Sequence, residues 1–332
     1  MDVNEYLEMR GRAEMRERER ARRRRRGSAT AVAVIVTFTL LTGIFGIPKI
    51  AGLNLKPGTI PIPEPALSGK VSIESDLSIN SRAAALLDVK TGKIIFDKNS
   101  TAKIYPASLT KVMTAIVAIE RIEDLNTRIV LNEPMFYPLY TKNAATAGFS
   151  PGDSVTALDL LYGLLLTSGA ECAAGLAEFV AGSEIAFAEI MNDKAQKIGM
   201  KGTHFTNATG LHDETLYSTA EDMAALFTYA LNDDTFFEII TSESYITDPT
   251  NTHPEGIRLS STLFSNMTGA LFPDGRILGG KTGYTYEAGQ CLASFAVKEG
   301  KIFVLVTAGA AGENGTHNLH IDDAFRIYGA IK

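Results

Sequence analysis

Hydrophobic and polar positions follow two different periods along this chain. AAALLDV and KIIFDK are short apolar runs on either side of residues 90–92, a Lys-Thr-Gly triplet, so this region predicts a strand, a turn and a second strand. A helical period begins after Pro106, with apolar side chains at Val112, Ala115, Ile116, Ile119 and Ile122. This spacing predicts an amphipathic helix.

The middle of the chain, from Asn126 to about Asn232, has a mostly helical pattern. Thr156 and Asp159 predict a capping box for TALDLLYGLLL, and residues 167–169 separate that helix from AECAAGLAEFVA. Near the end, GQCLASFAV and IFVLVTAGA predict a second hairpin, and DDAFRIYGAI a final helix. Strands at both ends with helices between them predict one α+β domain whose sheet is assembled from the two chain ends.

Charge is unevenly distributed over the 332 residues, which carry a net charge of −6. Residues 1–27 contain ten Arg and six acidic residues, so the remainder carries about −10, and its main body is a poor candidate for binding nucleic acid. The arginine run precedes about twenty uncharged residues, 28–47, which are enough to cross a bilayer with the N-terminus inside. A cleaved signal peptide is the alternative, but no A-x-A-like site follows Ile47.

Four segments are therefore expected in a single-pass protein of the cell membrane. These are a cytoplasmic Arg-rich tail at 1–27, one transmembrane helix at 28–47, a linker at 48–70 and an extracytoplasmic folded domain at 71–332. The linker contains four prolines within a dozen residues, a composition that favours an extended spacer.

Metal and cofactor chemistry is not indicated by the sequence. Cys172 and Cys291 lie far apart and form no C-x-x-C pattern, so we expect two small buried side chains and no disulfide framework. The five histidines include no H-E-x-x-H pattern, and His317 and His320 resemble the polar start of the last helix. We expect no metal and no cofactor.

The segment GRILGGKTGYT, residues 275–285, allows two interpretations. Its first eight residues fit the phosphate-loop pattern G-x-x-x-x-G-K-[ST], and its Lys281-Thr282-Gly283 core fits the third motif of penicillin-recognising serine enzymes. A phosphate loop needs a strand before it and a helix starting at the Lys-Thr pair. Here LFPDG predicts a turn before the motif and a strand-like run follows it, so the context favours the serine-enzyme motif.

The pattern S-x-x-K occurs twice, at Ser100 to Lys103 and at Ser108 to Lys111. The first pair lies in a polar link with no helix to align its side chains. The second lies at the start of the strong helix, where positions three apart share a face. There a desolvated, partly neutral Lys111 can accept the proton of the Ser108 hydroxyl, and the helix N-terminus favours developing negative charge.

Three motifs follow one another in the order Ser108-x-x-Lys111, Ser168-Gly169-Ala170 and Lys281-Thr282-Gly283. Together with longer stretches such as HFTNATGLHDETLYSTAEDMA and GGKTGYTYEAGQCLASFA, this order resembles the serine D-alanyl-D-alanine carboxypeptidases of peptidase family S11, the low-molecular-weight penicillin-binding proteins. The likeness runs from about residue 82 to residue 332. It implies an α+β fold of the β-lactamase/DD-peptidase type, in which helices flank an antiparallel sheet built from both chain ends and a mostly helical segment is inserted.

The resemblance also implies roles for the motif residues. Ser108 is expected to be the acylated nucleophile, Lys111 its general base and Ser168 a proton relay toward the leaving amine. The expected chemistry is removal of the terminal D-alanine from peptidoglycan stem peptides through an acyl-enzyme, with β-lactams as covalent inhibitors. Acyl transfer needs such a base-activated serine whatever the name of the family.

The third motif is expected to bind substrate. By the same resemblance, Lys281 and Thr282 hold the terminal carboxylate of the substrate, and Gly283 and Tyr284 belong to the same binding strand. The backbone N–H groups of Ser108 and Tyr284 are expected to form the oxyanion hole, because acyl transfer needs donors aimed at the tetrahedral oxyanion.

Two features depart from the family pattern. The second motif usually ends in Asn, whose amide helps to orient the catalytic lysine, but this chain has Ala170. Loss of one such hydrogen bond typically costs about 1 to 3 kcal/mol, which is compatible with a slower enzyme or a shifted substrate preference and does not imply an inactive one. Glu171 follows on a predicted helix, where the sequence leaves its direction open and a solvated position is one alternative. Relatives often carry a β-rich domain and a C-terminal anchor, and we expect the N-terminal span to replace that anchor.

Other readings of the chain remain open from sequence. A serine β-lactamase-like hydrolase would need an activated water to hydrolyse the acyl-enzyme. A catalytically weakened peptidoglycan-binding or sensor protein would retain the fold with little catalytic activity. His212 and Asp213 could be mistaken for a catalytic pair, but we interpret them as part of a loop that shapes the site. Substrate-groove lining and ordinary packing are equally compatible with Tyr137, Tyr140 and Lys142.

Overall fold

The computed structural model describes residues 77–312 and 317–332. The predicted tail, membrane span and linker all lie outside these residues and stay predictions. Within the described ranges, no helix combines the length and the apolar character that crossing a bilayer requires.

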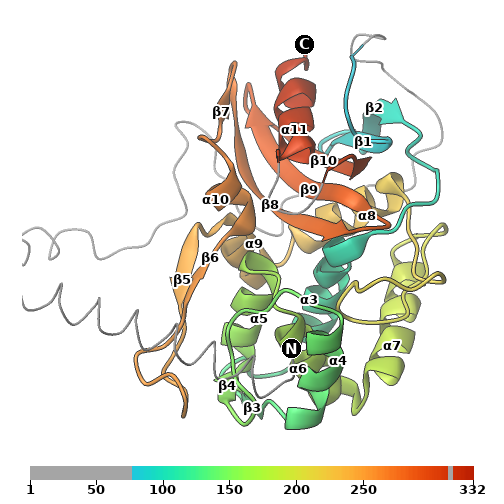
Figure 1. Ribbon diagram of the computed structural model, residues 1–332. Coiled ribbons are helices and arrows are strands. Elements are labelled where there is room, and N and C mark those ends of the chain that lie inside the picture. Colours follow the sequence, from blue (N-terminus) through green and yellow to red (C-terminus); the bar gives the residue numbers. More distant parts are fainter. Residues whose placement is uncertain (1–76, 313–316) are drawn as a thin grey trace, which may run out of the picture. The chain divides into compact units, whose positions relative to one another are not determined.

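A six-stranded antiparallel sheet joins the two ends of the described chain (Figure 1). Its strand order is β2 (Lys93–Lys98), β1 (Ala83–Asp88), β10 (Lys301–Ala310), β9 (Gly289–Lys298), β8 (Gly275–Thr285) and β7 (Leu271–Phe272). The register pairs Leu86 with Leu305 and Val304 with Phe295, so early and late segments share the sheet centre. The predicted α+β domain with a sheet from both ends is confirmed.

Helices are the main regular structure between β2 and β7. Their bounds are α3 (Thr110–Arg121), α4 (Phe136–Thr141), α5 (Ala157–Leu166), α6 (Ala170–Ala181), α7 (Glu184–Lys197), α8 (Ala220–Ala230), α9 (Asp234–Thr241) and α10 (Thr262–Asn266), with α11 (Leu319–Gly329) after the sheet. Short 3-10 turns are η1 (Ala107–Leu109) and η2 (Glu133–Met135). Thr156 caps α5 by accepting a hydrogen bond from the Asp159 backbone N–H at 3.0 Å, as the capping box predicts.

Two small two-stranded antiparallel sheets within the helical part were not expected from the sequence. One pairs β3 (Arg128–Val130) with β4 (Ser154–Thr156), and the other pairs β5 (Ser244–Ile246) with β6 (Arg258–Ser260). Each of these strands has three residues, which is too short for an alternating pattern to be recognised over the helical period around it.

Both faces of the main sheet are covered. Phe303 and Leu305 of β10 belong to one buried cluster with Ile327 and Tyr328 of α11. Because side chains alternate along a strand, Val304 points to the other face, where α8 packs against β1, β9 and β10 and where Val304 is fully buried (Figure 1). This double cover fixes the sheet, and with it the position of β8, against the helical part.

Candidate active site

Ser108 lies in η1, immediately before α3 begins. Ala107, which precedes it, has a positive φ of 47°, a conformation that costs energy in a residue other than glycine and is found most often at functional sites. The Lys111 Nζ donates a hydrogen bond to the Ser108 Oγ at 3.1 Å. The predicted serine and lysine therefore meet on one side of this helix start.

Lys111 is held in a buried position. Its Nζ also donates a hydrogen bond to the Thr209 backbone carbonyl at 2.5 Å, which fixes the ammonium beside the serine. Burial lowers the pKa of Lys111 to about 8, while the charges of nearby acidic groups, Glu171 foremost, act in the opposite direction. A lysine with a pKa near 8 is neutral in part at physiological pH and can act as a general base.

Ser168 and Lys281 connect the second motif to the third. The Lys281 Nζ donates to the Ser168 Oγ at 2.9 Å and to the Thr282 carbonyl at 2.8 Å. Ser168 has a positive φ of 65°, which turns it into the site just ahead of α6. Burial, together with the charge of Lys111, lowers the pKa of Lys281 well below its usual value.

Gly283 brings β8 against Ser108, the predicted nucleophile. A β-carbon at this position would lie 3.1 Å from the Ser108 backbone nitrogen and 3.3 Å from the Pro106 carbonyl oxygen. On the other side of η1, Gly210 has a φ of 77°, and a β-carbon there would collide with the Ala107 carbonyl. Two glycines thus let two backbone segments close on the turn that carries the serine.

The hydroxyl groups of Thr282 and Thr262 lie 2.8 Å apart. Thr262 begins α10, so this bond ties the third motif to a second element beyond the sheet. Tyr284 lies two residues after Thr282 on β8 and pairs with Gln290 of β9. Its backbone therefore directly follows Gly283, the residue that packs on Ser108. The sequence reading missed Thr262 and Thr209, because neither carries a motif of its own.

The duplicate motifs do not assemble. Lys103 donates to the Glu214 carbonyl at 3.4 Å and lies over the ring of Tyr217, and no hydrogen bond joins it to the buried Ser100 in the described structure. The Lys-Thr-Gly triplet at 90–92 lies in the turn between β1 and β2. The segment 275–285 is one continuous strand rather than a loop and helix start, so a phosphate loop is excluded there.

His212 and Asp213 make other contacts. The His212 ring packs edge-on against Tyr105, and its Nδ1 lies 3.9 Å from the Glu287 carboxylate. Asp213 accepts hydrogen bonds from the backbone N–H and the hydroxyl of Thr215. These bonds fit the interpretation of this pair as part of a loop near the site.

Glu171, whose direction the sequence left open, is buried. This residue lies in the first turn of α6 with no exposed surface, and its Oε1 accepts hydrogen bonds from the backbone N–H groups of Ala147 and Gly148 at 2.6 and 3.0 Å. The sequence spacing could have indicated this burial, because Glu171 lies four residues before Gly175 and so shares a helix face with a buried position.

The two cysteines, Cys172 and Cys291, are free and buried, as predicted.

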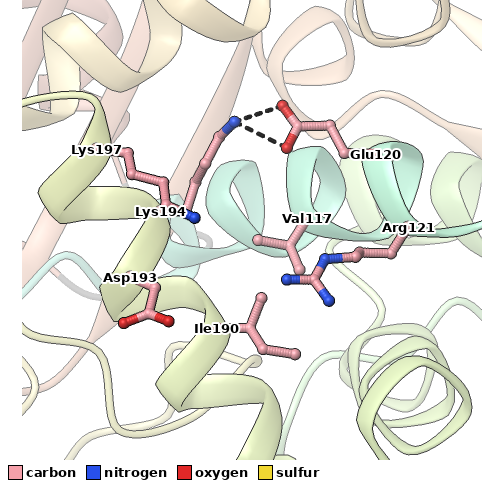
Figure 2. A pocket seen from close by; sticks show the side chains of 7 residues that line it. All are labelled: Val117, Glu120, Arg121, Ile190, Asp193, Lys194 and Lys197. Carbon is pink, nitrogen blue, oxygen red and sulfur yellow. Dashed lines mark hydrogen bonds and ion pairs between the residues drawn. The ribbon is translucent and has the colours of Figure 1, made fainter.

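A small cavity of about 170 Å³ lies between α3 and α7. Figure 2 shows the ion pair between Lys194 and Glu120 at its edge, with Arg121 and Lys197 pointing toward the same space. It contains none of the residues that the sequence predicts for the site.

Comparison with known proteins is consistent with this arrangement. The model for peptidase S11, described as D-alanyl-D-alanine carboxypeptidase, matches residues 70–312. The chain belongs to this family. The D-alanyl-D-alanine carboxypeptidase DacF of Bacillus subtilis (strain 168) is 33% identical over 267 residues, which are 76% of this chain and 64% of DacF. DacC of Escherichia coli (strain K12) is 31% identical over 254 residues, which are 74% of this chain and 60% of DacC. The matches thus span less than two thirds of these two S11 relatives.

Solved structures share the fold of this S11 chain. The crystal structure of the Streptomyces K15 DD-transpeptidase has a TM-score of 0.68 and 25% sequence identity, and the match covers 77% of this chain and 98% of that one. A D-alanyl-D-alanine carboxypeptidase from Mycobacterium tuberculosis H37Rv has a TM-score of 0.65 and 26% identity, with 79% and 95% covered. The expected DD-peptidase fold with a helical insertion is confirmed.

Proposed function

We propose that this protein is a serine D-Ala-D-Ala carboxypeptidase that removes the terminal D-alanine of peptidoglycan stem peptides through an acyl-enzyme. The observation that carries the proposal is the 3.1 Å hydrogen bond from the Lys111 Nζ to the Ser108 Oγ, made by a lysine whose pKa is lowered to about 8. Nucleophile and base are within proton-transfer distance, and the base is suited to neutral pH.

Acylation follows from this geometry. The Ser108 Oγ attacks the carbonyl carbon of the scissile peptide bond while its proton passes to the Lys111 Nζ. The oxyanion that forms is stabilised by the backbone N–H groups of Ser108 and Tyr284. The C–N bond then breaks, and the departing D-alanine amine receives a proton by way of Ser168. Water later hydrolyses the ester and restores Ser108.

The substrate carboxylate is assigned to the third motif. Lys281 is buried and has a lowered pKa, so an anionic C-terminus supplies the counter-charge that the free site lacks. The Thr282 hydroxyl, oriented by Thr262, adds a neutral hydrogen bond. Because Lys281 would pair with the terminal carboxylate of the substrate, the activity should require that carboxylate to be free. β-Lactams that carry a carboxylate beside a strained amide should acylate Ser108 in the same way.

The anchored topology is a separate part of the proposal. The arginine run at 22–26 followed by the uncharged segment 28–47 supports a single N-terminal span with the catalytic domain outside the cytoplasm. Fractionation of cells that express the full chain, with protease added to intact spheroplasts, tests it. The catalytic domain should sediment with membranes and be digested from outside. Protection from the protease would contradict the orientation.

The function is tested by D-alanine release from a peptide that ends in D-Ala-D-Ala, with the full chain and its Ser108→Ala and Ser100→Ala variants. Release should vanish in Ser108→Ala and persist in Ser100→Ala. Equal loss in both variants, or no release by a folded wild-type protein, would reject the assignment. Rapid release of hydrolysed penicillin would instead favour a β-lactamase.

A further inference from the structure

Glu171 ties a separate segment to the start of α6. The Glu171 carboxylate accepts hydrogen bonds from the backbone N–H groups of Ala147 and Gly148. Beside it, the Ala170 N–H donates to the Ala145 carbonyl at 2.8 Å. Residues 145–148 are thereby held beside the second motif. Gly169 packs on the same segment, because a β-carbon there would lie 2.9 Å from the Ala147 Cβ. The carboxylate is part of the frame that sets the position of Ser168.

The second oxygen of this carboxylate has no partner of its own. Within the described structure the Oε2 of Glu171 is buried and accepts no hydrogen bond. Burial raises the pKa of Glu171, while the surrounding backbone N–H groups act in the opposite direction. The N-terminal turn of α6 also favours a negative charge at this position. A buried carboxylate with an unused oxygen needs a positive group nearby.

Lys111 is the buried amine whose pKa the charge of Glu171 raises. Helix α3 packs against α6, and among the charges that raise the pKa of Lys111 the contribution of Glu171 is the largest. The other ionisable groups that raise the pKa of Lys111 are Cys172 on α6 and Glu184 at the start of α7. Lys111 itself lowers the pKa of Lys281 on β8. Of the two carboxylates that act on Lys111, Glu171 is the one without exposed surface.

We propose that Glu171 is a positioning residue of the active site, whose carboxylate fixes the second motif and serves as the buried counter-charge for the Lys111 ammonium formed during acylation. The inference rests on the proposed function, since it concerns the same proton transfer. When the Ser108 proton moves to the Lys111 Nζ, a full positive charge appears in a desolvated place. Ala170 offers no side-chain oxygen to stabilise that charge. The carboxylate of the next residue does so through space.

The pH dependence of acylation separates this role from a purely structural one. The full chain and Glu171→Gln are compared by their rates of labelling with a fluorescent penicillin between pH 5.5 and 10. Gln retains an oxygen for the two backbone N–H groups but not the charge. Loss of the charge lowers the pKa of Lys111. The midpoint, the pH at which the labelling rate reaches half of its plateau, should therefore move to a lower value. The plateau rate should fall about tenfold, because the ammonium is less stabilised.

Glu178→Gln is the matched control. Glu178 lies on the same helix but is exposed and accepts a hydrogen bond from Asn132, so its variant should keep the wild-type midpoint and plateau. A folded Glu171→Gln protein with the wild-type midpoint, whatever its rate, would overturn the inference and leave Glu171 a structural residue.

Glu171→Asp covers the case in which Glu171→Gln does not fold. It keeps the charge on a shorter side chain, so its midpoint should stay with the wild type even if its rate falls. A midpoint moved to lower pH in this variant would contradict the inference. If the wild-type chain forms no acyl-enzyme at any pH, the proposed function fails and this inference falls with it.

Discussion

The backbone of Gly283 lies against the backbone of Ser108, so closely that a β-carbon on residue 283 would be 3.1 Å from the Ser108 nitrogen. This contact joins residues far apart in sequence, one on the strand proposed to bind substrate and one on the turn that carries the proposed nucleophile. It sets the distance between the reacting hydroxyl and the third motif. A side chain at residue 283 would open that distance.

Gly283→Ala should therefore slow acylation. The added methyl group forces β8 or η1 to move by a few tenths of an ångström, and we expect a loss on the order of tenfold in the rate of β-lactam labelling, because small misplacements of reacting groups are costly. Gly329→Ala is the control, since a β-carbon there meets no atom within 4 Å. Equal rates in both variants would show that the close approach is not needed.

Lys111 should give acylation a characteristic pH dependence. Only the neutral amine accepts the Ser108 proton, and with the pKa lowered to about 8 the neutral fraction grows as pH rises through that value. The labelling rate should rise from about pH 6 and level off above about pH 9. Stopped-flow or gel-based labelling across this range measures it. A rate that falls over the same interval would assign the base role to another group.

Lys281 should govern the requirement for a terminal carboxylate. In the wild type, a peptide ending in D-Ala-D-Ala should have a much higher kcat/KM than the corresponding C-terminal amide. Lys281→Gln should reduce this preference by about ten- to a hundredfold, the value of a hydrogen bond to a charged group. Lys301→Gln, at an exposed lysine of β10, serves as control. An undiminished preference would place the carboxylate elsewhere.

His320 should make the fold sensitive to acid. Burial lowers the pKa of His320 to about 4 from an ordinary value of 6.5. The unfolded chain therefore binds a proton at this residue that the folded chain does not, so stability is lost as pH falls from 6.5 to about 4.

The loss at His320 amounts to about 3 kcal/mol of unfolding free energy. His320→Gln can still hydrogen-bond Gln290, as the His320 Nδ1 does at 2.9 Å, and should remove that part of the acid sensitivity. Urea unfolding of both proteins at pH 7 and pH 4.5 tests this. Identical losses between the two pH values would contradict it.

The sequence could predict the fold because its strong signals are local or periodic. The helix after Pro106 and the hairpins near both ends follow from apolar spacing, and the pairing of Ser108 with Lys111 follows from helical geometry. The choice between duplicate motifs also depended on local context, and the structure agrees, since Lys103 turns toward Glu214.

The remaining features depend on contacts between distant segments, which a single sequence does not encode in a readable pattern. Thr209 reaches Lys111 across 98 residues through a backbone carbonyl, a group that every residue possesses. Glu171 is buried because the segment 147–148 supplies N–H groups to it, and an acid near a helix N-terminus is equally compatible with solvent. The three-residue strands β3 to β6 exist through their pairing rather than through their own pattern.

The most direct test of the account is the site of covalent modification by benzylpenicillin. The full chain is incubated with the drug, and intact-protein and peptide mass spectrometry locate the adduct. One penicilloyl group is expected on Ser108, present in Ser100→Ala and absent in Ser108→Ala. An adduct on another residue, or none on a folded protein, would contradict the assignment of Ser108 and Lys111 as nucleophile and base.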